Sequence, residues 1–143
     1  MNVVIDTITW SLALRRRYGS LNSLEQQVVR ELAELVRTSR ALMIGAIRQE
    51  VLSGIRQHSQ FAVLRDYLRD FRDEPVSMID HERAAEHYNT CQSHGIQGSH
   101  ADFLICAVAE RLDATIFTLD ADFTRYARHL PITLHTVRDG PTS

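Results

Sequence analysis

The chain has 143 residues, a formal net charge of −2 at pH 7 and a hydrophobic content of 44%. These values exclude intrinsic disorder and favour one domain over residues 1–143, and the presence of only two cysteines argues against a disulfide scaffold. All 16 basic residues are arginines, which excludes chemistry that needs a lysine amine, such as Schiff-base formation. The N-terminus lacks a signal-peptide pattern, and no apolar run approaches the roughly 20 residues that span a bilayer. We therefore expect a cytoplasmic protein with no membrane partner.

Apolar runs alternate with helical periodicity in the first half of the chain. In chain order, the pattern predicts a strand over Val3–Ile5, a helix from Ile8 to Gly19, a helix from Ser23 to about Arg37, a strand over Leu42–Ile44 and a helix over Ile47–Ile55. Gly19 supplies a helix stop, and Ser23 with Gln26 has the spacing of a capping box. Leu24 is expected on the buried face of the second helix.

The second half continues the alternation and ends in a short apolar run. It predicts a helix over Gln60–Phe71, a strand over Val76–Ile79, a helix from an Asp80 N-cap to about Ser93, a glycine-bearing loop over 94–99, a buried helix over Ala101–Leu112, a strand over Thr115–Leu119, a helix over Asp120–Ala127 and a strand over Ile132–Leu134. Five short strands that alternate with helices predict an α/β fold with a parallel sheet between helical layers.

Four acidic residues are placed near one edge of this predicted sheet. Asp6 and Asp120 come directly after strand-like runs, at the carboxyl edge where such sheets bind ligands. Glu50 and Asp102 lie early in helices, shortly after the chain has left that edge. Crowded carboxylates repel each other and resist burial in the ionised form, and a hard cation such as Mg²⁺ or Mn²⁺ resolves both problems. A cation held in this way can activate water and stabilise the charge on a phosphodiester.

Each acid also has a plain structural interpretation. Asp6 has the position of a helix N-cap, and Asp102 follows Ser99 with the spacing of a capping box. Asp120 and Asp122 fit the first turn of a helix, where the helix dipole favours acidic residues. A single helical glutamate usually faces solvent. The joint placement of the acids, rather than any one of them, therefore favours a metal site.

Four segments in chain order resemble those of PIN domains, specifically VapC-type toxins of bacterial toxin–antitoxin pairs: VVIDTITWSLALRR, IGAIRQEVLSGI, GSHADFLICAVAERLDATIFTLDADF and HLPI. The resemblance covers nearly the whole chain. It implies a three-layer α/β/α PIN-like fold with a central parallel sheet of about five short strands. It also implies a metal-dependent endoribonuclease, which hydrolyses RNA phosphodiester bonds with metal-activated water. A cognate antitoxin protein and a second copy of the chain, in a homodimer, are the partners that it implies.

The resemblance gives each acid a role. Asp6, Glu50, Asp102 and Asp120 match the four acids of the family in order. We expect Asp6 and Asp102 to bind the principal Mg²⁺ or Mn²⁺, with Asp120 adding a direct or water-mediated contact. Glu50 would hold a second ion or orient the attacking water. Cleavage would then leave 5′-phosphate and 3′-hydroxyl ends. The expected supporting residues are Thr7 and Thr118, through their hydroxyls, and Asp122, which would share or replace the role of Asp120.

A basic cluster lies close to the proposed active edge. Arg15, Arg16 and Arg17 are candidates for contacts with RNA phosphates. Further candidates around the rim are Arg48, Arg56, Arg125 and Arg128. A solvated helical face is an equally open interpretation for each arginine. Trp10 is expected in the core rather than against a base.

Other functional classes fit the sequence less well. Receiver domains and haloacid-dehalogenase-like phosphatases normally need a lysine, and no G-x-G-x-x-G follows the first strand, as dinucleotide binding would require. Cys91 and His94 have a metal-like spacing, but no second pair completes a zinc site. The alternative that stays open is a catalytically inactive PIN-like module that binds RNA or protein.

Overall fold

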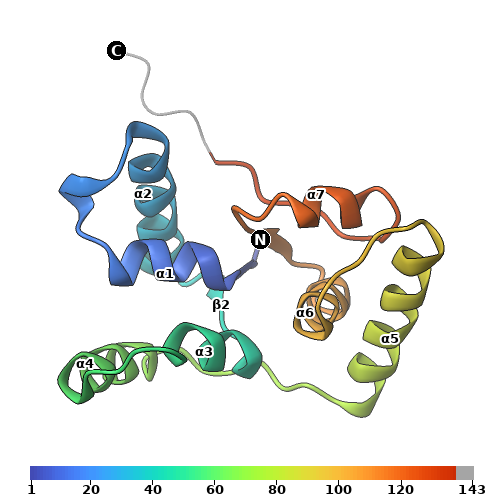
Figure 1. Ribbon diagram of the computed structural model, residues 1–143, viewed down its shortest axis with the longest axis horizontal. Helices are drawn as coiled ribbons and strands as arrows, with labels where there is room; N and C mark the ends of the chain where they lie inside the picture. Colours follow the sequence, from blue (N-terminus) through green and yellow to red (C-terminus); the bar gives the residue numbers. More distant parts are fainter. Residues whose placement is uncertain (138–143) are drawn as a thin grey trace.

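A three-stranded parallel sheet lies at the centre of the structure, a computed structural model that describes residues 1–137 (Figure 1). Its strands are β1 (Val3–Ile5), β2 (Ala41–Leu42) and β3 (Thr115–Phe117), in the order β2-β1-β3. Every residue of β1 and β3 is buried, because helices cover the sheet on both faces. Burial on both faces explains why these strands are continuous apolar runs rather than alternating ones.

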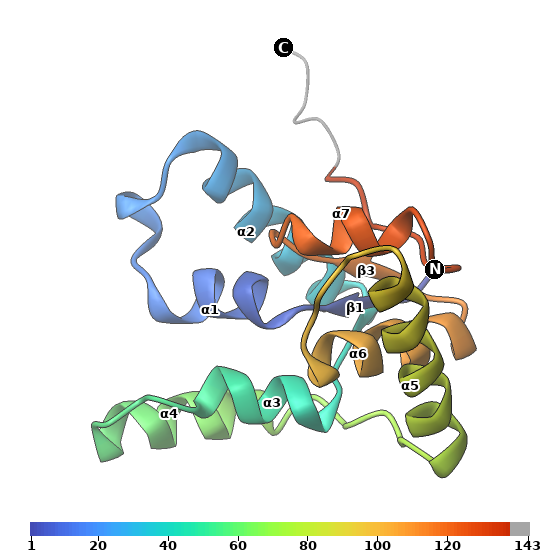
Figure 2. The ribbon, with the colours of Figure 1, turned by 45° about the vertical axis from the view of Figure 1, so that its right-hand side comes forward.

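Helices form the outer layers on both sides of the sheet. They are α1 (Thr7–Arg15), α2 (Ser23–Arg37), α3 (Gly45–Leu52), α4 (His58–Leu68), α5 (Met78–Ser93), α6 (His100–Arg111) and α7 (Asp122–Ala127), with a short 3-10 turn at Tyr18–Ser20. In both views α1 and α2 lie on one side, and α6 lies on the other with α5 outside it (Figures 1 and 2). The three-layer α/β/α fold is therefore confirmed. None of the helices within residues 1–137 is long and apolar enough to cross a membrane.

The sheet has fewer strands than the five that the sequence predicts. The strand over Val76–Ile79 is wrong, because α5 already begins at Met78. Ser77 and Asp80 form a capping box that starts this helix, so Asp80 lies in its first turn and is not the N-cap. The last predicted strand is reduced to an isolated bridge between Leu134 and Ile116. A second isolated bridge joins Met43 to Asp73 and extends the β2 edge.

Several predicted helix ends are displaced. The first helix ends at Arg15 instead of Gly19, and the second is capped by Asn22 with Glu25 rather than by Ser23 with Gln26. Leu24 then lies in the first turn and is 64% exposed, against the prediction that it is buried. The predicted strand over Leu42–Ile44 is shifted to Ala41–Leu42, because Ile44 already caps α3. Such shifts leave the order of the elements unchanged.

Helix α6 fixes the part of the fold that matters for the site. As predicted, it is buried along most of its length, and it packs against β1 and β3. Ion pairs hold α5 against its outer face: Arg111 binds the buried Asp80 at 2.7 Å, and Arg83 binds Glu110 at 2.9 Å. His87 also contacts Glu110, at 2.7 Å. These ion pairs fix the C-terminal end of α6 to α5, and the packing of α6 on β1 and β3 orients the rest of the helix.

Candidate functional site

Asp6 lies at the carboxyl end of β1 and is only 5% exposed. Its side chain caps α1, because Oδ1 accepts a hydrogen bond of 2.7 Å from the backbone N–H of Thr7. Oδ2 accepts a second bond, of 2.8 Å, from the hydroxyl of Thr118. The N-cap interpretation of Asp6 is thus correct as far as it goes, but it uses only one of the two carboxylate oxygens.

Thr118 connects Asp6 to the loop that follows β3. Its Oγ1 donates to Asp6 and accepts a bond of 2.9 Å from the backbone N–H of Asp120. Oδ1 of Asp120 in turn accepts a bond of 2.9 Å from the N–H of Asp122. This chain of bonds fixes the loop so that Asp120 lies beside Asp6.

Asp102 reaches the same place from the first turn of α6. Ser99 caps this helix by accepting a bond of 3.1 Å from the N–H of Asp102, which is half of the expected capping box. The carboxylate of Asp102 does not complete the box, since its Oδ2 accepts a bond of 2.7 Å from the hydroxyl of Tyr126. Tyr126 lies on α7 and is fully buried. Tyr126 is not predictable from the sequence, because a tyrosine in a short helix has no distinguishing pattern.

The three aspartates form one electrostatic unit. Burial raises the pKa of the Asp6 carboxyl above its usual value, and hydrogen bonds from Thr118 and Thr7 partly lower that pKa again. The neighbouring charges of Asp102 and Asp120 raise the pKa of Asp6 further. Across residues 1–137, no arginine or histidine forms an ion pair with any of the three. Among the described residues, this partly buried group of acids therefore has no cationic side chain to balance it.

Glu50 and Asp122 stand apart from this unit. Glu50 is exposed on α3, and it reaches the site through a 3.2 Å bond from the hydroxyl of Thr7. The Asp122 carboxylate pairs with Arg125, three residues further along α7. Asp120, rather than Asp122, is the acid of this loop whose charge acts on Asp6.

The donor set fits a hard divalent cation in part. All the side-chain atoms of this group that could bind a metal are carboxylate oxygens, which Mg²⁺ and Mn²⁺ prefer as ligands. Nowhere in the described part of the chain do three His, Cys, Asp or Glu side chains come close enough to form a complete metal site. Mg²⁺ usually keeps several waters and binds through one or two carboxylates, so a site of this kind does not need a complete protein cage.

A groove of about 510 Å³ adjoins the acids. The residues that line it are Thr7, Ile8, Ser11, Leu12, Arg15, Arg16, Glu25 and Leu119. Thr7 binds Glu50, and Leu119 lies between Thr118 and Asp120 in the chain. Two residues that line the groove are therefore next to the acids or bonded to one of them. Of the arginines on its rim, Arg16 pairs with Glu25 at 3.0 Å. Arg15 is exposed at the end of α1.

The remaining candidate arginines are placed differently. The guanidinium of Arg48 bonds Asp73 and the carbonyls of Leu68 and Phe71, so it links α3 to the end of α4. Arg17, Arg56 and Arg128 are exposed. Trp10 is fully buried and packs against Phe71, with ring centroids 5.0 Å apart, which confirms its place in the core.

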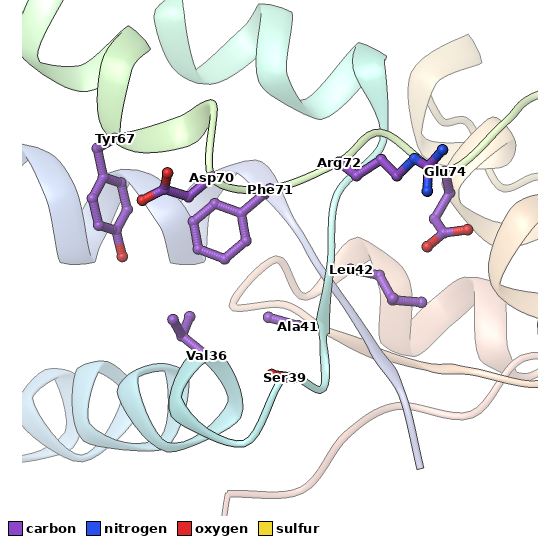
Figure 3. A pocket seen from close by; sticks show the side chains of 9 residues that line it. All are labelled: Val36, Ser39, Ala41, Leu42, Tyr67, Asp70, Phe71, Arg72 and Glu74. Atoms are coloured by element: carbon purple, nitrogen blue, oxygen red, sulfur yellow. The ribbon is translucent and has the colours of Figure 1, made fainter.

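A second hollow, of about 400 Å³, lies at the β2 edge of the sheet and contains none of the predicted site residues (Figure 3). Tyr67 of α4 and Phe71, in the turn after α4, face Val36 of α2 across it. Its lining mixes apolar side chains with Asp70, Arg72 and Glu74. The convergent acids therefore lie in a different part of the molecule from this hollow.

Comparison with known families gives one match, to the PIN domain, over residues 3–129. The chain belongs to the PIN domain family. PIN domains are generally nucleases and typically use divalent metals. A group of acids such as Asp6, Asp102 and Asp120 has the oxygen ligands that a divalent metal prefers. No curated protein sequence matches the chain significantly.

Solved structures share the fold along nearly the whole chain. FitAcB from Neisseria gonorrhoeae has 20% sequence identity and a TM-score of 0.73, over 94% of this chain and 96% of that one. VapBC2 from Rickettsia felis, bound to a DNA fragment from their promoter, has 17% identity and a TM-score of 0.69, over 94% and 98%. FitAB bound to an IR36 DNA fragment has 17% identity and a TM-score of 0.69, over 93% of each chain. At these identities the likeness establishes the fold.

Proposed function

We propose that this PIN domain is a metal-dependent endoribonuclease whose cation is held by Asp6, Asp102 and Asp120. The observation that carries the proposal is that Asp6, buried at the end of β1, lies beside Asp102 and Asp120, with no ion pair to any of the three within residues 1–137. Clusters of like charge that burial makes unfavourable are typical of functional sites. The family match supports the class of reaction.

The residues of the chain would divide the work as follows. Thr118 and the N–H of Thr7 hold Asp6, so that its carboxylate keeps one orientation. Asp102 and Asp120 add the further oxygen ligands, and Glu50, at the exposed margin, orients the attacking water or holds a second ion. When bound, Mg²⁺ or Mn²⁺ would activate water and neutralise charge on the phosphodiester.

The residues that line the groove beside the acids favour a polynucleotide as the substrate. Exposed apolar side chains, Ile8 at 47% and Leu119 at 41%, offer a surface on which a base can lie. Arg15 on the rim can contact a phosphate, since arginine side chains provide many of the phosphate contacts in protein–nucleic acid complexes. Metal-activated water needs no ribose hydroxyl, so the products should carry 5′-phosphate and 3′-hydroxyl ends.

We also propose that the nuclease is the toxin of a toxin–antitoxin pair and acts as a homodimer that an antitoxin protein inhibits. The support is the resemblance of its four segments to VapC-type toxins, together with a fold shared with FitAcB and VapBC2. Expression of the chain in a bacterium should then arrest growth, and expression of the Asp6→Ala variant should not. Normal growth with the active enzyme present would contradict the toxin assignment and leave the nuclease assignment standing.

The nuclease assignment is tested by incubating purified protein with mixed cellular RNA in the presence of Mg²⁺, Mn²⁺ or EDTA. We expect discrete cuts with either metal and none with EDTA. The Asp6→Ala variant should make no cuts, and a matched control, Asp66→Ala, should cut as the wild type does, because Asp66 is exposed on α4. Equal cleavage by the Asp6 variant would overturn the proposal. Binding without cleavage under every metal would favour the inactive module instead.

A further inference from the structure

Tyr126 is the one buried tyrosine among residues 1–137, and its hydroxyl donates a hydrogen bond to the carboxylate of Asp102 in the candidate site. The ring is held by Phe103 and Phe123, with centroids 4.9 and 5.1 Å from its own. The hydroxyl of this packed ring donates a hydrogen bond of 2.7 Å to Oδ2 of Asp102. Within the described residues, Oδ1 of Asp102 accepts no hydrogen bond, so the two oxygens of this carboxylate are not equivalent.

Gly98 makes room for this arrangement. A Cβ atom at Gly98 would lie 2.8 Å from Cζ of Tyr126 and 2.8 Å from Cζ of Phe103, and it would be closer still to the tyrosine hydroxyl. Real Cβ atoms do not approach other atoms so closely, so a side chain here would force Tyr126, Phe103 or the loop itself to move. The loop over residues 94–99 thus depends on a glycine at the point where it passes over Tyr126.

The Tyr126 hydroxyl has a single hydrogen, which it can donate to only one acceptor at a time. In this structure that acceptor is Oδ2 of Asp102, so the hydrogen is not shared with Oδ1.

We propose that Tyr126 is a positioning residue for Asp102: its hydroxyl occupies Oδ2, so that Oδ1 alone is offered to the cation, and Gly98 is required for that bond. The inference rests on the proposed function, since it takes Asp102 to be a ligand. Hydrogen-bonded partners of this kind orient metal ligands, and their loss typically weakens metal binding by about 10- to 100-fold. Thr118 has the same relation to Asp6, through a bond of similar length.

The test is the affinity for Mn²⁺, measured by electron paramagnetic resonance on wild type, Tyr126→Phe and Tyr88→Phe. Tyr88→Phe is a matched control because Tyr88 also packs on Phe103, whereas its hydroxyl has no hydrogen-bond partner in residues 1–137. We expect Tyr126→Phe to bind Mn²⁺ at least about tenfold more weakly and the control to bind as the wild type does. The Mn²⁺ concentration for half-maximal RNA cleavage should rise by the same factor, and excess Mn²⁺ should restore the rate.

The outcomes separate this inference from the proposed function. Wild-type protein that binds no Mn²⁺ would overturn both. Wild-type binding that Tyr126→Phe leaves unchanged would overturn the positioning role alone. Gly98→Ala supplies an independent variant, which should weaken Mn²⁺ binding in the wild-type background and have a much smaller effect in the Tyr126→Phe background. Full additivity of the two changes would contradict the link between Gly98 and the hydroxyl.

Discussion

Replacing Asp102 by asparagine should change stability in opposite directions with and without a divalent cation. In EDTA, the variant removes a negative charge that raises the pKa of the buried Asp6 carboxyl. The amide oxygen of the new side chain can still accept the Tyr126 hydrogen bond, so the packing is kept. Removing this repulsion should raise the free energy of unfolding of the metal-free protein.

With Mn²⁺ present the order should reverse. A ligand at 100 times its dissociation constant stabilises the folded state by about 2.7 kcal/mol. For a chain of 143 residues the unfolding entropy is about 0.3 kcal/mol/K, so the wild type should melt about 9 °C higher with Mn²⁺ than without it. The Asp102→Asn variant should lose most of this increase, while melting above the wild type in EDTA.

Thermal unfolding followed by circular dichroism, in EDTA and over a Mn²⁺ titration, measures both effects. Asp66→Asn is the matched control, since it removes an exposed carboxylate from α4 and should leave the increase with Mn²⁺ intact. An Asp102→Asn variant that is less stable than the wild type in EDTA would refute the repulsion argument. An undiminished increase with Mn²⁺ would refute the ligand role of Asp102.

Other contacts lead to three further predictions. The metal-free wild type should lose stability relative to Asp6→Asn as the pH rises from 3.8 toward the raised pKa of Asp6. In that pH window the Asp6 carboxyl keeps its proton in the folded state and loses it in the unfolded state. Urea denaturation at several pH values measures this difference. Arg111→Ala should lower the free energy of unfolding by about 2–3 kcal/mol at pH 7, because the Asp80 carboxylate, 2% exposed, loses its cation. Arg111 lowers the pKa of Asp80, so this loss should shrink as the pH falls below 3.8, where the pair contributes less; urea curves at pH 7 and pH 3 would show it. Arg15→Ala should weaken RNA binding and reduce the salt slope by about one, whereas Arg69→Ala, on the exposed end of α4, should change neither in a fluorescence titration.

The order of elements could be predicted from the sequence because burial dictates it. The strands β1 and β3 are buried on both faces, and a short continuous apolar run such as Val3–Ile5 is typical of a strand buried in this way. The Val76–Ile79 strand was wrong for the converse reason, since the apolar Met78 and Ile79 are exposed at a helix start that Ser77 and Asp80 determine. A capping interaction that spans three residues outweighed local strand propensity.

For the candidate site, the sequence predicts only which acids follow a strand or begin a helix. Asp6 and Asp120 follow strands, and a parallel sheet brings such positions together without further information. The contacts that orient the acids depend on residues far apart in sequence: Thr118 lies 112 residues from Asp6, and Tyr126 lies 24 from Asp102. No periodicity encodes such pairs, and the need for Gly98 emerges only when the Tyr126 ring is in place.

We propose that one group of aspartates both binds the cation and drives cleavage. The most direct test follows Mn²⁺ binding and RNA cleavage on the same protein over one range of Mn²⁺ concentrations. We predict that the two curves superimpose for the wild type and that Asp6→Asn abolishes both. Cleavage that persists in EDTA, or Mn²⁺ binding that Asp6→Asn leaves intact, would contradict the claim.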